Sequence, residues 1–316
     1  MLAAGAPDLW RFQPHPEVWV LVLSLAALYV GAVRVVGPKA VPEGTPVLSR
    51  RNKAAAVAGI VLLWVASDWP MHDIAEEYLY LVHMVQHTIL TLVVPPLALL
   101  ATPRWLADLV LGSGRVRRVI QVAAKPVVAG VAFNAMTMAV HWPTLVNASV
   151  SNGVLHYGLH VALVFTAFMM WTPVCGPIEE WRMSPPAQMI YLFLMSVVPT
   201  VPGGWLTFAE GAVYDSYDIP QRAFGLSVQD DQQAAGVFMK LAAGGELWVI
   251  ITAMFFVWAF RHMRAEEELA RADRAPATPD GPAARADGDE PLTYDEVERA
   301  FAETAAAPEP DRPRRR

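Results

Sequence analysis

Seven apolar stretches, each about the length of a membrane-spanning helix, fill most of the chain before residue 261. They lie near residues 18–36, 53–69, 78–102, 126–142, 153–173, 187–208 and 236–260. A helix needs about 20 apolar residues to cross the hydrocarbon core of a bilayer. With 54% hydrophobic and 17% charged residues, the composition is too apolar for an ordinary soluble enzyme. We therefore predict an all-α fold, a polytopic membrane bundle of seven transmembrane helices.

Two of these stretches depart from a regular span. The second is short, and Trp64 and Trp69 are expected to anchor it at the outer interface. The sixth contains two prolines and two glycines between residues 199 and 204. Because proline removes a backbone donor, we expect the sixth span to kink or unwind there.

Basic residues between the stretches predict the orientation, since short loops rich in Lys and Arg stay in the cytoplasm. The loops after the first and third stretches carry Lys39, Arg50, Arg51, Lys53, Arg104, Arg115, Arg117, Arg118 and Lys125. The loops at 68–77 and 143–152 carry no Lys or Arg, and the loop at 209–235 carries only Arg222. We predict a multi-pass protein of the bacterial plasma membrane with its N-terminus outside and its C-terminus in the cytoplasm.

Three regions follow from this pattern. Residues 1–17 form an outer N-terminal segment without the basic start of a cleaved signal peptide, so the first apolar stretch is expected to remain as a span. Residues 18–262 form the seven-helix transmembrane domain. Residues 263–316 consist largely of Ala, Pro and charged side chains and end in RPRRR. Such a composition does not build a core, which predicts a disordered cytoplasmic tail.

Two His-x-x-x-His pairs lie inside the apolar stretches. His83 and His87 belong to the third stretch, and His156 and His160 to the fifth. A spacing of four residues places both rings of a pair on one helix face, about 6 Å apart along the axis. Polar side chains at this depth are rare and usually face a bundle interior, a cavity or a cofactor. The pairs therefore predict a metal or haem site between helices.

Other side chains reach the same level of the predicted bundle. His141 ends the fourth stretch, where Met138 shares its face, and His72 lies in an outer segment. Imidazole and thioether ligands together suit copper, especially Cu(I). A single buried histidine is more often a hydrogen-bonded core residue than a ligand, which applies to His72. Methionines such as Met84 are ordinary fillers of apolar packing.

Several motifs together resemble one family. They are HMVQHTIL, the Pro95–Pro96 pair, LHYGLH, and VYDSY followed by DDQQAAGVFMK. The chain is similar over about residues 15–260 to the CtaG-type cytochrome c oxidase assembly factors. The resemblance implies a multi-span bacterial membrane protein that helps to produce active haem-copper oxidase and handles copper. It maps the family's histidine pairs onto His83, His87, His156 and His160, and its outer acidic motif onto Asp231 and Gln232.

The chain also departs from the family pattern. It has Ala234 and Ala235 where paired glycines are usual, and Lys240 where the family usually has tryptophan. A lysine beside the predicted site would disfavour a bound cation or hold Asp231 in a salt bridge.

The leading hypothesis is a non-enzymatic assembly factor that binds copper in the outer half of the membrane and aids metallation of an oxidase subunit. Its predicted ligands are His83, His87, His156, His160, His141, His72, Asp231 and Met138. The expected partners are oxidase subunits, a copper donor protein on the outer side and membrane lipid, with no nucleic acid.

Three other functions were weighed. A membrane cytochrome with bis-histidine haem ligation is the alternative, but it needs only two of the four or more histidines. A hydrolase is disfavoured because the chain has no H-E-x-x-H motif. A copper permease would need ligands that continue to the inner side, where the spans are almost purely apolar.

Overall fold

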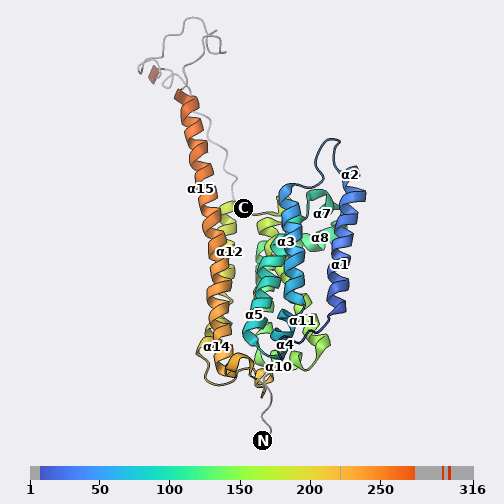
Figure 1. Cartoon of the computed structure of the whole chain (residues 1–316). Helices are drawn as coiled ribbons and strands as arrows, with labels where there is room; N and C mark the ends of the chain where they lie inside the picture. Colours follow the sequence, from blue (N-terminus) through green and yellow to red (C-terminus); the bar gives the residue numbers. More distant parts are fainter. Residues whose placement is uncertain (1–7, 221, 275–293, 295–297, 300–316) are drawn as a thin grey trace, which may run out of the picture. The chain divides into compact units, whose positions relative to one another are not determined.

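The computed structural model describes residues 8–220, 222–274, 294, 298 and 299. Within this part of the chain every regular element is a helix (Figure 1). The residues divide into two units at Ala259 and Phe260. The first unit contains the helical bundle, and all contacts described below lie within it.

The longer elements are α-helices, several of them grouped into continuous spans. Their bounds are α1 Pro16–Gly31, α2 Gly37–Ala40, α3 Arg50–Ser67, α4 Met71–Glu77, α5 Tyr80–Thr88, α6 Val94–Ala101, α7 Arg104–Leu111, α8 Arg115–Ala123, α9 Pro126–Val140, α10 Pro143–Val150, α11 Gly153–Cys175, α12 Pro185–Val197, α13 Thr200–Phe208, α14 Val228–Phe238 and α15 Gly244–Arg274. Three π-helical segments, Ala32–Val36, Ile89–Val93 and Met239–Ala243, join α1 to α2, α5 to α6 and α14 to α15.

Six helical runs are long and apolar enough to cross a membrane. They are Pro16–Ala40, Arg50–Glu77, Tyr80–Ala101, Gly153–Cys175, Pro185–Phe208 and Val228–Arg271. A seventh is obtained if α8 and α9, which are bent by 70° to each other, are counted as one span. The predicted all-α polytopic membrane bundle is therefore confirmed. Which end of the bundle faces outward stays a prediction.

The helix irregularities have identifiable causes in the sequence. Pro95 and Pro96 follow the π-helical segment Ile89–Val93. A proline ring clashes with the carbonyl four residues earlier and has no N–H to donate, so a wider helical turn before it relieves the conflict. In the sixth span the predicted interruption is present but short, because only Val198 and Pro199 separate α12 from α13.

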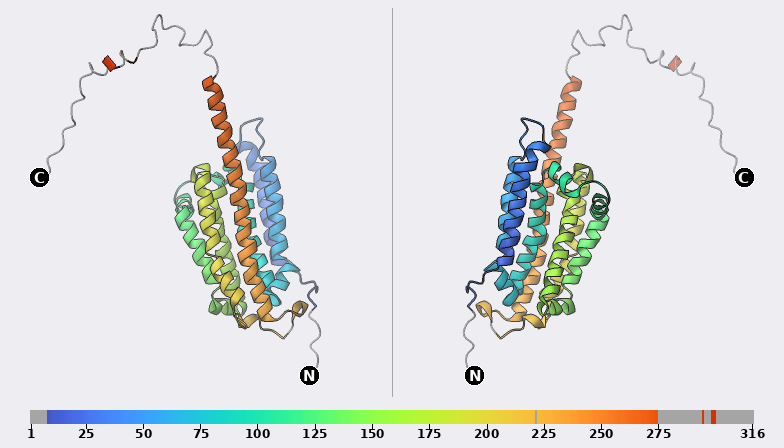
Figure 2. Two further views of the ribbon diagram at one scale, coloured as in Figure 1. Left: turned by 90° about the vertical axis from the view of Figure 1, so that its left-hand side faces the viewer. Right: turned by 90° about the vertical axis from the view of Figure 1, so that its right-hand side faces the viewer.

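The core of the bundle lies between α6, α9, α11, α12 and α15. Phe133, Trp171 and Leu192 are buried in its largest apolar cluster, together with Leu247 of α15. The Trp171 Nε1 donates a hydrogen bond to the carbonyl of Thr91 at 3.1 Å, which ties α11 to the π-helical segment beside α5. At the edge of the bundle, α1 packs on α3, as both views in Figure 2 show.

The last helix is longer than the sequence suggested. Residues 263–274, which composition assigned to the tail, belong to α15. A run of Ala, Glu and Arg explains this, because these residues favour helix even without a core. The remainder of the predicted tail, except Tyr294, Glu298 and Arg299, lies outside the described residues.

Candidate metal site

Both histidine pairs meet at one end of the bundle. His83 and His87 lie on α5, and His156 and His160 lie on the first two turns of α11. The ring centroids of His83 and His87 are 4.3 Å apart, and those of His156 and His160 are 4.4 Å apart. The structure therefore brings together all four histidines that the sequence singled out.

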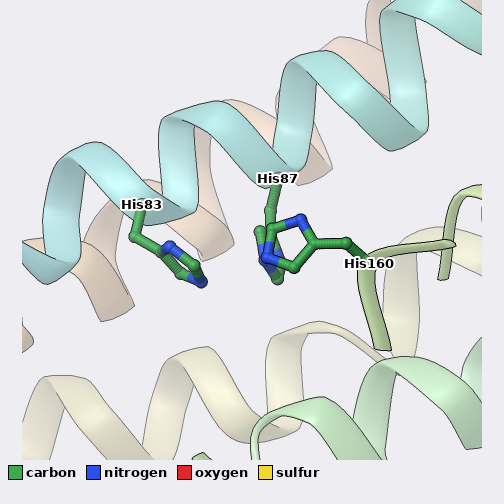
Figure 3. A group of neighbouring side chains, drawn as sticks. All are labelled: His83, His87 and His160. Atoms are coloured by element: carbon green, nitrogen blue, oxygen red, sulfur yellow. The ribbon is translucent and has the colours of Figure 1, made fainter. Parts of the chain in front are cut away.

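The closest contact joins the two helices. The Nε2 atoms of His87 and His160 are 3.3 Å apart, with the rings at 89° to each other (Figure 3). Figure 3 also shows that His83 and His87 project from the same side of α5 toward this point. With bonds of about 2.0 Å, two nitrogens on a tetrahedral ion are separated by about 3.3 Å. The spacing therefore fits chelation of one ion.

Glu76 at the end of α4 contacts both pairs. Its Oε1 lies 3.1 Å from Nδ1 of His83 and 3.2 Å from Nε2 of His156. The Glu76 side chain is 21% exposed and brings a carboxylate among these rings. The sequence patterns did not single out Glu76 as a site residue.

Two overlapping groups of three side chains have donor atoms close enough to hold a metal ion. One is His83, His87 and His160, and the other is Glu76, His156 and His160. In each group the donor atoms lie within 4.8 Å of one another. The Oε1 of Glu76 and the Nδ1 of His83 are also buried without a hydrogen bond of good geometry. These two atoms lie 3.1 Å from each other, so they are the partners of an ion pair rather than free donors.

Asp231 has a different position from the predicted one. Its carboxylate accepts hydrogen bonds from the backbone N–H of Tyr80 at 2.7 Å and of Leu81 at 3.0 Å. These are the first N–H groups of α5, which lack partners within the helix. Asp231 therefore caps the helix that carries His83 and His87, and it belongs to neither group of metal donors. Its assignment as a ligand stays a prediction, and the contact that the structure shows is with the start of α5.

Gln232, the next residue, holds the loop before α14. Its Oε1 accepts from the backbone N–H of Val213 at 2.8 Å, and its Nε2 donates to the carbonyl of Tyr214. The Tyr214 hydroxyl donates to the carbonyl of His141 at 2.9 Å. Burial raises the pKa of Tyr214 to about 12, so its hydroxyl remains a donor. Asp231 thus contacts the start of α5, and Gln232 is linked through Tyr214 to His141 at the end of α9. The motif therefore holds two of the histidine-bearing helices in place.

His141 and Met138 separate in the structure. The His141 ring is buried at the end of α9, with its centroid 6.4 Å from that of His87. Its Nδ1 lies 2.6 Å from the carbonyl of Thr137, and its Nε2 lies 3.4 Å from the sulfur of Met84. Met138 lines neither of the two cavities that border these histidines. The methionine sulfur beside His141 is therefore that of Met84, which the sequence analysis had treated as packing.

His72 lies beside the cluster and outside both groups of donors. Its Nδ1 is 3.2 Å from the amide nitrogen of Gln86, and its ring is edge-on to His15 at 4.9 Å. His15 in turn contacts Asp73 at 3.1 Å. His72 is therefore a hydrogen-bonded neighbour of the cluster, which is the usual role of a lone buried histidine.

Lys240 does not lie in the site. Its side chain is exposed, and it lines neither cavity beside the histidines. No salt bridge involves Lys240 in the part of the chain that the structure describes. The expectation that its charge acts on the site therefore finds no support.

The comparison with known families now identifies the class of protein. The family model of the cytochrome c oxidase caa3 assembly factor, Caa3_CtaG, matches residues 27–261. The chain therefore belongs to this family of oxidase assembly factors. Neither the curated proteins nor the solved structures contain a significant match.

The geometry favours an ion over haem. Two axial ligands on opposite sides of one iron would hold their nitrogens about 4 Å apart at bond lengths near 2 Å. The 3.3 Å between His87 and His160 is shorter than this. The cavity lined by His83, His87, His156 and His160 measures about 20 Å³. Such a volume suits an ion or one water molecule rather than a macrocycle.

Proposed function

We propose that this protein binds copper at His83, His87 and His160 and supplies it for the assembly of a haem-copper cytochrome c oxidase. The observation that carries the proposal is the 3.3 Å approach of His87 and His160 from two different helices, with His83 in the same group. Copper is the cargo in this account, and the protein is not an enzyme.

The donor set supports copper. Imidazole binds copper in either common oxidation state, and copper stands at the top of the affinity order for divalent first-row metals. Glu76 places a negative charge 3.1 Å from His83, which offsets part of the charge of a bound cation. His156, on the far side of Glu76, is positioned to orient this carboxylate.

The family supports the destination. Its members assemble cytochrome c oxidase, and a haem-copper oxidase needs copper inside the membrane. A site on spanning helices holds the ion at a comparable depth. On the predicted topology, the histidine end faces outward in the bacterial plasma membrane and receives copper from a donor protein there. The partners are then the donor, the oxidase subunit and the surrounding lipid.

The test is complementation in the native host under copper limitation. Cells that lack the protein should have low oxidase activity, and the normal chain should restore it. His160→Ala removes the side chain common to both donor groups and should fail to restore activity, whereas added copper should partly rescue the cells.

The matched control is His262→Ala, which removes a histidine outside both groups. It should restore activity like the normal chain. Full restoration by His160→Ala, with equal amounts of protein in the membrane, would contradict the proposal.

A further inference from the structure

A second cavity continues from the histidine cluster toward the middle of the bundle. It measures about 60 Å³ and lies one helical turn further along α5, where Thr88 and Thr91 line it. His87 lines both this cavity and the smaller one among the four histidines. The imidazole of His87 therefore borders both cavities.

Three methionines from three different spans line this second cavity. They are Met84, Met195 and Met239, and each is at least nine-tenths buried. The sulfur of Met84 lies 3.4 Å from Nε2 of His141, which also lines the cavity. With bonds of about 2.0 Å to nitrogen and about 2.3 Å to sulfur, a tetrahedral ion separates two such donors by about 3.5 Å. The pair is thus spaced for one ion.

Polar groups without partners also border this cavity. The hydroxyl oxygen of Thr137 is buried and has no hydrogen-bond partner, and the residue is 7% exposed. An unsatisfied hydroxyl in an apolar interior has a cost in stability. Such a cost is tolerated where a ligand or water uses the group, which sets this cavity apart from a packing defect.

The helices change geometry around the same space. Thr91 and Leu92 belong to the π-helical segment Ile89–Val93, and Met239 begins the π-helical segment Met239–Ala243. Pro199, at the break between α12 and α13, also lines the cavity. π-helical turns often occur at functional sites, and interrupted membrane helices often surround a binding site. Three irregular spans therefore converge on one cavity.

We propose that this cavity is a Cu(I)-binding chamber, with Met84 and His141 as ligands and Met239 as a third donor. The proposal rests on the proposed function, because the chamber would receive its ion from the histidine cluster. Thioether sulfur prefers Cu(I) and is a poor ligand for Zn²⁺ or Cu(II). The four-histidine cluster would then accept copper, and the chamber would select the cuprous ion. Imidazole also binds Cu(I), so the transfer through His87 needs no change of oxidation state.

The test uses the full-length protein in detergent, without oxygen, titrated with Cu(I) against a competing cuprous chelator. X-ray absorption then reports whether sulfur is bound to the copper. The normal protein should show a sulfur shell near 2.3 Å, the typical metal–sulfur distance. Met84→Leu keeps the volume but removes the sulfur. It should reduce this shell from two sulfur atoms to one, because Met239 remains, and should weaken Cu(I) binding by at least the roughly tenfold typical of a lost outer partner.

The matched control is Met138→Leu, which removes a methionine that lines neither cavity. It should bind Cu(I) like the normal protein. Zn²⁺ binding should be unchanged in both variants, which shows that the histidine cluster is still folded.

Two results would overturn the chamber. One is a copper shell without sulfur in the normal protein, and the other is equal Cu(I) affinity in Met84→Leu and Met138→Leu. Failure of the proposed function has a different signature, since His160→Ala would then restore oxidase activity whatever the sulfur shell shows.

Discussion

The two ends of the helical bundle use charged and polar side chains in opposite ways. At the histidine end they are largely buried, with the His83 side chain 9% exposed and that of His156 12% exposed. At the end that carries α7 and α8 they form exposed ion pairs. There Arg104 contacts Glu180 at 2.7 Å, and the Glu180 side chain is 65% exposed.

This difference suits two separate roles, metal binding at one end of the bundle and orientation in the membrane at the other. Exposed ion pairs contribute little to stability, so the basic residues near α7 and α8 are best explained by the rule that keeps such loops in the cytoplasm. Buried imidazoles beside one carboxylate are costly unless they bind something or are fully hydrogen-bonded. On the proposed function the histidine end carries the metal site, and on the predicted topology the basic end faces the cytoplasm.

The two ends should differ most in their accessibility to a reagent added outside the cell. In a Cys175→Ala background, Ala148→Cys at the histidine end should react with a membrane-impermeant reagent added outside intact cells. Ser113→Cys at the basic end should be protected until the cells are opened. Both positions are exposed in the structure, so packing does not decide the outcome. The reverse pattern would place the histidines on the cytoplasmic side.

Substitutions at the two ends should also differ in their effect on copper affinity. This contrast should be smaller than the contrast in accessibility. Glu76→Gln removes the charge that lies between His83 and His156. We expect it to weaken copper binding by about 10- to 100-fold, as loss of an outer-shell carboxylate commonly does. Asp108→Asn removes a carboxylate paired with Arg117 at the basic end and should leave the affinity unchanged. Equal effects in a copper titration would remove the distinction between the ends.

Stability should respond to the cap on α5. Asp231→Asn retains the shape but leaves one of the two bonded backbone N–H groups without an acceptor. A lost cap or charged hydrogen bond typically costs about 1–2 kcal/mol, so the Tm should fall. Asp230→Asn, at the exposed neighbouring position, is the control and should change the Tm less. A bound-copper spectrum unchanged in Asp231→Asn would agree with capping, whereas loss of an oxygen ligand from that spectrum would restore Asp231 as a ligand.

The smallest effect concerns His15 at the edge of the histidine end. Burial lowers its pKa, but hydrogen bonds to Asp73 and Glu17 outweigh burial and raise it overall. The protonated ring therefore stabilises the fold fully below the unfolded pKa of about 6.5. This stabilisation is lost as the pH rises through the higher folded pKa. Over this pH interval the Tm of the normal chain should fall more than that of His15→Gln. Parallel curves of Tm against pH for the two proteins would exclude a contribution of His15 to stability.

The sequence predicted the spans and the histidine pairs because both depend on local patterns. Apolar length identifies a membrane helix, and a spacing of four places His83 beside His87 whatever the rest of the chain does. The interruption at Pro199 was equally local, since proline acts on its own helix.

Contacts between distant segments could not be predicted in this way. Asp231 caps α5 from 150 residues further along the chain, and no spacing rule encodes that. Met84 was dismissed because methionine is common in cores, and only the position of His141 reveals its sulfur as a neighbour. Glu76 was not singled out from the sequence, because its contact with His156 depends on how α4 meets α11.

The central claim is that the histidine end holds copper through both helices at once. Its most direct test is the Cu(II)-to-protein ratio of the purified full-length chain after exposure to Cu(II), which the thioether chamber disfavours, compared with the variant that carries His87→Ala and His160→Ala. The normal protein should hold stoichiometric copper and the variant should lose it, with both retaining the same helical content. Stoichiometric copper in the double variant, or none in the normal protein, would contradict it.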